Sequence, residues 1–153
     1  MRIIVDADAC PVLDNIVKIS SKYNLELILV CDSAHYINLE GATTITVSQG
    51  VDSADFKIVN MLNKGDIVVT QDYGLAALAI ARNAKAINQN GMIYSETNID
   101  SLLMSRHMAK KIRSASKRSP IKTRLKGPAK RTKEHDFAFD KAFEELILEC
   151  LPK

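Results

Sequence analysis

IIVDAD, at residues 3–8, is a mostly β-branched apolar run that ends in two acids. Such a short run, bounded by polar residues, is typical of a strand buried on both faces of a parallel sheet. DIVVTQD, at residues 66–72, has the same pattern, because its apolar stretch again leads to an acid. Strands of this kind occur where helices cover both faces of a sheet, so the two segments predict an α/β fold.

Apolar runs alternate with helical stripes along the rest of the chain. Strands are expected at residues 1–5, 25–31, 43–47, 67–70 and 84–87, with a short edge strand at 92–95. Helices are expected at 11–22, 50–63, 75–81 and 97–113, and again from 135. Short connections between them favour an open, mostly parallel sheet of order 3-2-1-4-5 with helices on both faces.

The 153 residues suit one main domain, followed by a basic segment and a final helix. The α/β domain is expected at residues 1–113. Residues 114–134 lack periodicity and contain two prolines, a glycine and many cations, so we expect them to be flexible. Residues 135–153 carry apolar side chains at helical spacing, which predicts a C-terminal helix that packs back on the domain.

Apolar stripes also predict which helix faces are buried. In the helix at 50–63 we assign three residues to the inner face, namely Phe56, Val59 and Leu62. In the helix at 97–113 the expected core stripe comprises Ile99, Leu102, Leu103 and Ile112.

Four aspartates are placed to meet at one edge of this sheet. Asp6 and Asp8 end the first strand and Asp72 follows the fourth, while Asp55 lies in the first turn of a helix. In the order 3-2-1-4-5 the first and fourth strands are neighbours, so their acids share the crevice at the carboxyl ends. Carboxylates gathered there repel one another unless a hard divalent cation takes them as ligands. The sequence therefore predicts a site for Mg²⁺ or Mn²⁺.

Helix capping is the competing interpretation of these acids. Asp72 suits the N-cap of the following helix, and Asp55 in a first turn is favourable to the helix dipole. Capping does not explain Asp6 and Asp8 together, because one cap needs one carboxylate and a second like charge is unfavourable. Asp32 also ends a strand and is a candidate for the lining of the crevice, but we do not count it among the ligands.

Cysteine and histidine indicate no competing site. The cysteines are odd in number and lack metal-ligand spacing, which argues against disulfides and zinc; they are Cys10, Cys31 and Cys150. The histidines lie in loops or basic stretches and suit solvated or phosphate-contacting roles; they are His35, His107 and His135. No apolar run reaches 18 residues and no basic-then-apolar leader is present, so we expect a cytoplasmic protein without a membrane partner.

The net charge of +3 conceals a strong division of charge. Of the 21 Lys and Arg residues, 12 lie between Arg106 and Lys133, where there is no acid, which leaves nine against 18 acids elsewhere, a formal −9. A basic stretch of this kind favours binding of a polyanion such as nucleic acid. The predicted nucleic-acid-binding residues are Arg106, Lys110, Lys111, Arg113, Lys117, Arg118, Lys122, Arg124, Lys126, Lys130, Arg131 and Lys133.

The basic stretch contains no aromatic residue. We therefore expect it to contact the nucleic-acid backbone without base stacking, with little sequence discrimination and a steep dependence on salt. Tyr36, Tyr73 and Tyr94 are the candidates for stacking near the crevice, although ordinary packing is the commoner role for each.

Four segments occur in the same order in a known family. They are MRIIVDADACPV (1–12), QGVDSADFKIVNML (49–62), GDIVVTQDYGLAALAI (65–80) and RTKEHDFAF (131–139). The chain thereby resembles, over nearly its whole length, the YaiI/YqxD family of uncharacterised bacterial proteins, which are related to the PIN-like and NYN nucleases. The resemblance implies a PIN-like fold and metal-dependent cleavage of nucleic acid, with RNA as the expected partner. PIN-like domains often pair, so it also implies a homodimer, although the sequence carries no interface signature.

In the PIN-like group an acid ends the first strand, another lies on a helix before the fourth strand, and Thr-x-Asp follows that strand. Asp6, Asp55 and residues 70–72 match these places. Asp8 departs from the pattern as an additional acid, and so does the long basic segment after the domain.

The chemistry implied is hydrolysis of a phosphodiester by water activated by one or two Mg²⁺ or Mn²⁺ ions. Asp6 and Asp72 are expected to bind metal directly. Asp8 and Asp55 are expected to bind it directly or through water, and Thr70 to orient a ligand or a bound water. These five residues form the predicted catalytic site.

Two other protein classes stay open. Residues 6–8 at a strand end are similar to the nucleophile motif of haloacid-dehalogenase-type phosphatases, in which the first Asp attacks phosphate. Those enzymes usually carry Thr or Val where Cys10 stands, and their later Lys and paired acids have no secure counterpart here. The other class is a non-catalytic RNA-binding or ribosome-associated protein, whose acids hold a structural ion or none.

Overall fold

The computed structural model describes residues 1–50, 53–118 and 129–152 of the chain. Within these residues one six-stranded sheet has the order β3-β2-β1-β4-β5-β6. Its strands are β1 (Arg2–Asp6), β2 (Glu26–Asp32), β3 (Thr43–Val47), β4 (Ile67–Val69), β5 (Lys85–Ile87) and β6 (Ile93–Tyr94). The helices are α1 (Leu13–Lys22), α2 (Ser53–Met61), α3 (Tyr73–Ala81), α4 (Glu96–Arg118) and α5 (Lys133–Cys150).

The predicted fold class is confirmed. Strands β3, β2, β1, β4 and β5 pair in parallel in the expected order, and β6 adds an antiparallel edge beside β5. β1 and β4 are neighbours, with Val5 paired with Val69. Because parallel strands end at the same edge, this register brings the residues after β1 and after β4 together.

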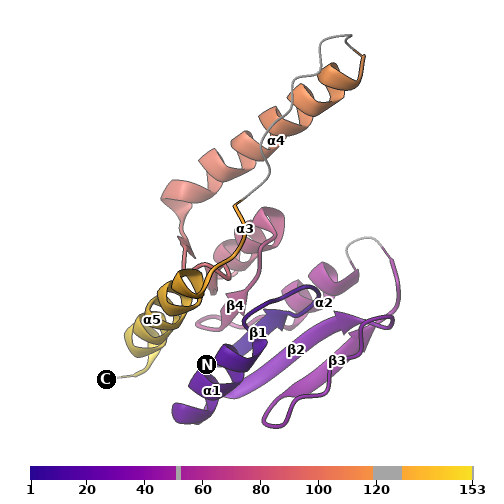
Figure 1. Cartoon of the computed structure of the whole chain (residues 1–153). Coiled ribbons are helices and arrows are strands. Elements are labelled where there is room, and N and C mark those ends of the chain that lie inside the picture. Colours follow the sequence, from indigo (N-terminus) through magenta and orange to yellow (C-terminus); the bar gives the residue numbers. More distant parts are fainter. Residues whose placement is uncertain (51–52, 119–128, 153) are drawn as a thin grey trace.

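Helices lie on both sides of the sheet (Figure 1), and alternate residues of the central strands β1, β2 and β4 belong to two separate cores. Ile3 and Val5 point into a core closed by α1 and α5, whereas Ile4 between them belongs to the core under α2, α3 and the start of α4. All three are completely buried. The continuous apolar run IIV is thus required by burial on both faces of the sheet.

The last helix is part of the first of these cores. Phe139 and Phe143 are completely buried on α5 and their rings stack with centroids 5.1 Å apart. Ile147, a turn further on, is also completely buried in the same core as Ile3 and Val5. The C-terminal helix therefore covers one face of the sheet together with α1.

α4 differs from its expected extent and burial. Its first turns contribute Ile99, Leu102 and Leu103 to the second core, and the rest of the helix leads away from the sheet (Figure 1). Ile112, which we expected in the core stripe, is 39% exposed because this part of α4 extends beyond α3 and does not pack against it. The helix also continues past residue 113 to Arg118, over a sequence containing good helix formers.

α2 presents a different face from the one expected. Ile58 is completely buried, whereas Phe56, which we assigned to the inner face, is 67% exposed. Residues two apart on a helix point roughly 200° apart, so burial of Ile58 turns Phe56 toward solvent. The assignment of Phe56 to the core was therefore wrong.

Candidate metal centre

The turn after β1 presents two acids from one short segment. Asp6 ends the strand, Ala7 is buried, and Asp8 follows. The chain then turns through Ala9, whose φ of 58° lies in the left-handed region, and the Cys10 N–H donates to the Ala7 carbonyl at 3.2 Å. A non-glycine residue in this conformation is uncommon and is often found near functional sites.

In the turn after β4, the Thr70 side chain links Asp72 to Asp6 by hydrogen bonds. The Thr70 hydroxyl donates to Asp6 Oδ2 at 3.2 Å and accepts from the Asp72 N–H at 3.0 Å. Thr70 is only 3% exposed, so this hydroxyl is held in place. Asp72 is the N-cap of α3, where its Oδ1 accepts from the Leu75 N–H at 3.0 Å. The capping interpretation of Asp72 therefore applies, and the same carboxylate also faces the site.

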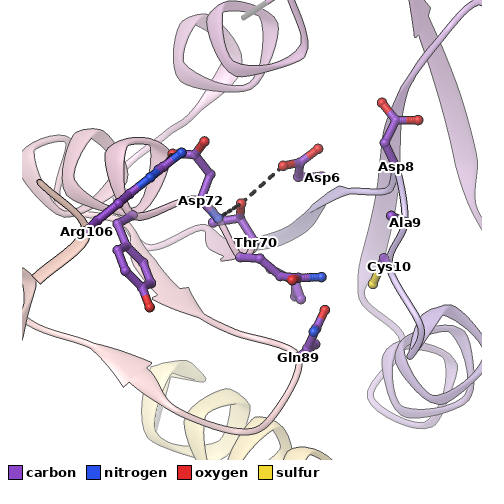
Figure 2. A pocket seen from close by; sticks show the side chains of 11 residues that line it. Asp6, Asp8, Ala9, Cys10, Thr70, Asp72, Gln89 and Arg106 are labelled. Atoms are coloured by element: carbon purple, nitrogen blue, oxygen red, sulfur yellow. Dashed lines mark hydrogen bonds and ion pairs between the residues drawn. The ribbon is translucent and has the colours of Figure 1, made fainter. Parts of the chain in front are cut away.

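These side chains line a crevice of about 480 Å³ at the carboxyl edge of the sheet. We call it the acidic crevice; its polar wall includes Asp6, Asp8, Thr70, Asp72 and Arg106. Figure 2 shows Asp6 and Asp72 joined through Thr70, with Asp8 on the other side of Asp6 in the turn after β1. The structure thus brings together four of the five predicted catalytic residues.

The acidic crevice is electrostatically unfavourable for Asp6. Burial raises the pKa of this carboxyl from 3.8 to about 6; the Thr70 hydrogen bond opposes the rise, and the charges of Asp55, Asp8 and Asp72 add to it. Arg106 on α4 has its Nη1 3.9 Å from Asp72 Oδ1, and its side chain is 59% exposed. An exposed pair at this distance provides little compensation.

Asp66, at the other end of β4, shows how the chain holds a buried acid for structural purposes. It accepts hydrogen bonds from the Arg2 N–H at 2.9 Å, the Arg2 guanidinium at 2.7 Å and the Asn63 N–H at 2.9 Å. Desolvation opposes its ionisation, but these bonds prevail and hold the pKa of Asp66 below its usual value. Asp6 shifts in the opposite direction, so the crevice is not built like a structural ion pair.

Asp55 occupies a neighbouring position. It lines a smaller cavity of about 180 Å³ together with Asp8 and Asp32, and Asp8 lines both cavities. Asp55 is nevertheless close enough for its charge to raise the pKa of Asp6. The structure therefore places Asp55 beside the acidic crevice, connected to it by Asp8.

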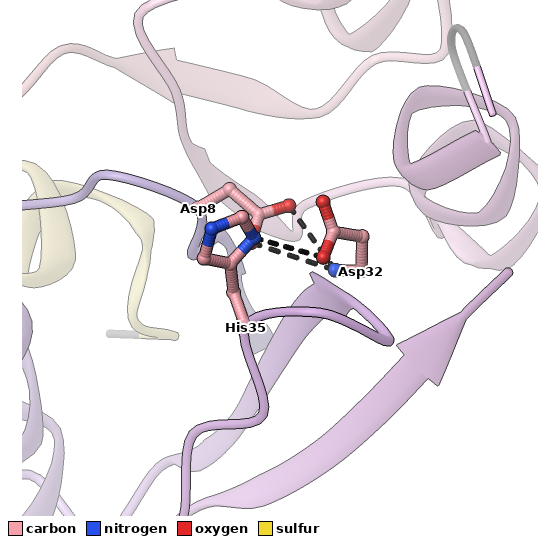
Figure 3. A group of neighbouring side chains, drawn as sticks. All are labelled: Asp8, Asp32 and His35. Atoms are coloured by element: carbon pink, nitrogen blue, oxygen red, sulfur yellow. Dashed lines mark hydrogen bonds and ion pairs between the residues drawn. The ribbon is translucent and has the colours of Figure 1, made fainter. Parts of the chain in front are cut away.

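Asp8 and Asp32, which line this smaller cavity, form a group with His35 that was not predicted from the sequence. Asp8, Asp32 and His35 each offer a ligand atom within 4.8 Å of the others (Figure 3). His35 Nδ1 lies 2.9 Å from Asp32 Oδ1 and 3.9 Å from Asp8 Oδ1, and the Asp32 N–H donates to Asp8 Oδ2 at 3.1 Å. The hydrogen bond with His35 holds the pKa of Asp32 below its usual value.

The sequence contained one signal for this group, because Asp32 ends β2 as Asp6 ends β1, on the neighbouring strand. His35 follows in the turn three residues later, at an i,i+3 spacing that allows contact with Asp32. A histidine in a polar loop, however, is more often solvated than bound.

Cys10 lines the acidic crevice but does not present a ready nucleophile. Burial raises the pKa of its thiol, with an opposing effect from a backbone hydrogen bond at Val12. The thiol form therefore predominates near neutral pH, and a thiol is a much weaker nucleophile than a thiolate.

The predicted basic residues within the described part of the chain lie on α4, at the start of α5 and just before it. Arg106, Lys110, Lys111 and Arg113 are exposed on α4, and Lys117 and Arg118 belong to its last turn. Lys130 and Lys133 are exposed, whereas Arg131 is held by Asp136, with Nη2 2.7 Å from Oδ1. Lys122, Arg124 and Lys126 lie outside the described residues.

The family model "Uncharacterized BCR, YaiI/YqxD family" matches residues 4–149. The chain belongs to this family. This YaiI/YqxD protein is 52% identical over 149 residues to the UPF0178 protein of Exiguobacterium sibiricum, covering 97% of the chain and 98% of the relative. It is 50% identical to the UPF0178 protein of Ruminiclostridium cellulolyticum, covering 93% and 89% respectively.

The UPF0178 protein of Clostridium acetobutylicum is 44% identical to this YaiI/YqxD protein, with 97% of each chain covered. No solved structure shows significant similarity to the chain. Among residues 1–50, 53–118 and 129–152, no helix combines the length and apolar character needed to cross a bilayer.

Proposed function

We propose that this YaiI/YqxD protein is a divalent-metal-dependent nuclease that hydrolyses phosphodiester bonds in RNA. The observation that carries the proposal is the shared wall of the acidic crevice, where Asp6 and Asp72 face the same space as Arg106. The two acids suit a metal ion, and Arg106 belongs to the basic helix α4. A metal-binding position and a polyanion-binding surface therefore meet at one place.

The residues fit a hard divalent cation. Three carboxylates provide oxygen ligands of the kind that Mg²⁺ and Mn²⁺ prefer, and Thr70 holds one of them in position. Asp6 is desolvated among like charges, which a cation would relieve. Asp6, Asp8 and Asp72 would hold the cation, which would supply an activated water and stabilise negative charge on the reacting phosphate.

The group at Asp8, Asp32 and His35 favours a second cation position in the same site. It shares Asp8 with the acidic crevice and adds an imidazole nitrogen, a ligand that suits transition metals better than Mg²⁺. We therefore choose Mn²⁺ for the first measurements. Homodimerisation and cytoplasmic location, both expected from the sequence, belong to this proposal as further expectations.

The protein's own groups would hold the substrate and the ligands. A hydrogen bond from the Thr70 hydroxyl positions the Asp6 carboxylate, and a hydrogen bond from the Asp32 N–H positions the Asp8 carboxylate. Arg106 is exposed at the edge of the crevice and offers a cation to a phosphate beside the cleaved bond. Lys110 and Lys111, one turn further along α4, would bind the next phosphates of the strand.

The test is cleavage of end-labelled single-stranded RNA with Mn²⁺ by the wild type and by Asp72→Asn. Asparagine is as good an N-cap as aspartate, so α3 should stay intact while a charged ligand is lost. We expect a loss of activity of at least about 100-fold in the variant, corresponding to roughly 3 kcal/mol of transition-state stabilisation, and no cleavage in EDTA.

The matched control is Asp100→Asn, which removes the same charge from an exposed residue of α4 outside both cavities. It should cleave like the wild type. Absence of cleavage by folded, Mn²⁺-loaded wild type would reject the nuclease proposal for this substrate. RNA binding that survives Asp6→Asn and Asp72→Asn would then select the non-catalytic class, and trapping of phosphate on Asp6 would select the phosphatase class.

A further inference from the structure

Another polar cavity, of about 310 Å³ and separate from the one lined by Asp55, adjoins the acidic crevice. We call it the base cavity; its wall includes Tyr73, Gln89, Asn90, Tyr94, Arg131 and His135. Tyr73 and Gln89 line the acidic crevice as well, and Figure 2 shows Gln89 at the rim of the crevice below Thr70. A group bound in the base cavity would therefore lie next to anything bound at the acids.

The base cavity is closed by the returning end of the chain. Gly91 has a φ of +88°, and a Cβ there would lie 2.6 Å from the Ala138 carbonyl oxygen, so only glycine lets this loop reach α5. Arg131 Nη2 then donates to the Gln89 carbonyl at 2.8 Å, and its Nη1 donates to Asn90 Oδ1. These contacts join two segments about 40 residues apart into one wall.

The loop that carries Gln89 is itself held in place. Asn88 Oδ1 accepts from the N–H groups of Asn90 and Met92, both at 2.9 Å. Behind it, Tyr94 is 3% exposed, donates its hydroxyl to the Thr70 carbonyl at 3.3 Å and meets Tyr73 edge-on at 6.0 Å. The cavity is therefore formed before any ligand binds, as small-molecule sites usually are.

The side-chain oxygen of Gln89 lacks a hydrogen-bond donor, which is evidence for a ligand. Gln89 Oε1 is buried and accepts no hydrogen bond from any residue in the described part of the chain. A buried acceptor without a donor is unfavourable, and native proteins rarely keep one without a reason. An N–H group of a bound molecule would satisfy it.

The chemistry of the wall selects the kind of molecule. Arg131 already donates to Asp136 at 2.7 Å, so its charge is compensated and the cavity is a poor phosphate site. What the wall offers instead is amide groups beside a tyrosine ring, the groups that proteins use to read and stack nucleobases. A volume near the lower end for small-molecule pockets, about 300 Å³, suits one base rather than a longer ligand.

We propose that the base cavity binds a single nucleobase of the RNA, next to the phosphate in the acidic crevice, with Gln89 accepting from an N–H on its Watson–Crick edge. This inference rests on the proposed nuclease function for the identity of the polymer. It also changes one expectation from the sequence, because base recognition would arise in the folded domain although the basic stretch lacks aromatic residues.

The first experiment needs no catalysis. The four ribonucleosides are titrated one at a time, in EDTA, into uniformly ¹⁵N-labelled wild type and Gln89→Met, with binding followed by NMR of the backbone and side-chain amides. Methionine keeps the volume of glutamine and removes the acceptor. We expect at least one nucleoside to shift Gln89 and Asn90, and Gln89→Met to bind it about tenfold more weakly.

The matched control is Gln49→Met, the same change at an exposed glutamine outside the base cavity, which should bind like the wild type. The spectra themselves report whether each variant is folded. Absence of shifts at the cavity with all four nucleosides, or unchanged affinity in Gln89→Met, would overturn the inference.

Mapping of cut sites on random-sequence RNA keeps the two proposals apart. If the wild type cleaves, the base beside the cut should be biased, and Gln89→Met should reduce that bias. Cleavage without any bias would overturn the base cavity and leave the nuclease intact. Nucleoside binding in EDTA without cleavage under any metal would reject the nuclease and retain the cavity.

Discussion

Asp6 lies in an environment that disfavours its charged form. It is desolvated at the end of a central strand and lies near three other carboxylates. Thr70 donates one hydrogen bond to it, whereas the structural acid Asp66 accepts three. Binding sites commonly keep such unfavourable groups because ligand binding, rather than folding, requires them.

Asp6→Asn should stabilise the metal-free protein, in EDTA, at neutral pH. Because the folded-state pKa of Asp6 is raised from 3.8 to about 6, the folded protein holds this proton more tightly than the unfolded chain. Stability contributed by this group is therefore present below pH 3.8 and declines as the pH rises to about 6. The asparagine variant avoids the decline and should be more stable at pH 7.5 by about 1–3 kcal/mol, measured by urea unfolding.

The advantage of Asp6→Asn should vanish near pH 4, and Mn²⁺ should stabilise the wild type more than the variant, because only the wild type keeps the ligand. Asp100→Asn is again the control and should differ little from the wild type at either pH. Destabilisation by Asp6→Asn at pH 7.5 would contradict the prediction and show that the charged carboxylate stabilises the fold.

At the scale of the element, α4 combines two functions that its sequence separates by position. Ile99, Leu102 and Leu103 attach its first turns to the domain. Further along, Lys110 and Lys111 are exposed, and so is an apolar strip made by Met104, Met108 and Ile112. The outer half of the helix is therefore free of the core and available to a polyanion.

Replacing Lys110 and Lys111 together with glutamine should weaken binding of single-stranded RNA and make it less dependent on salt. Each phosphate contact contributes about 0.7 to the slope of log affinity against log salt, so the slope should fall by about 1.4. Fluorescence anisotropy at several salt concentrations measures this slope. The lysine substitutions are made in the Asp72→Asn variant so that the RNA is not cleaved during the measurement.

Met108→Gln is the matched control on the same turn of α4, since it changes an exposed side chain without changing charge. Its salt slope should equal that of the parent. An unchanged slope in the double lysine variant would mean that α4 does not contact the phosphates, and the polyanion-binding surface would have to be sought elsewhere.

At the scale of the whole molecule, α5 joins the two ends of the chain into one core. Phe139 and Phe143 are buried against the same layer as Ile3 and Val5 from β1. The start of the same helix also holds the loop after β5 through Asp136 and Arg131. Loss of α5 should thus affect both stability and the base cavity.

Phe139→Ala should lower the free energy of unfolding by about 3–5 kcal/mol, because it empties a fully buried aromatic site. Phe137→Ala is the internal control two residues earlier on α5, where the ring is 72% exposed, and it should change stability by no more than about 0.5 kcal/mol. Chemical unfolding followed by circular dichroism compares the two. Equal effects would mean that α5 does not pack on the sheet as described.

The α/β class, the strand order and the meeting of Asp6, Asp8 and Asp72 could all be predicted from the amino-acid sequence. These features depend on local properties, because apolar runs specify buried strands and parallel strands deliver their carboxyl ends to one edge. The family also followed from motifs spread over the chain, and the match to residues 4–149 confirms it.

Other features depended on contacts between segments far apart in the chain. Phe56 is exposed because α2 turns its other side toward the sheet. Ile112 is exposed because that part of α4 extends beyond α3. The joining of Asp8 to Asp32 and His35 required the turns after β1 and β2 to lie together. The base cavity required Arg131 to return to the loop at Gln89, 42 residues earlier. Periodicity reports only on neighbours along the chain, so these pairings were decided by the tertiary structure.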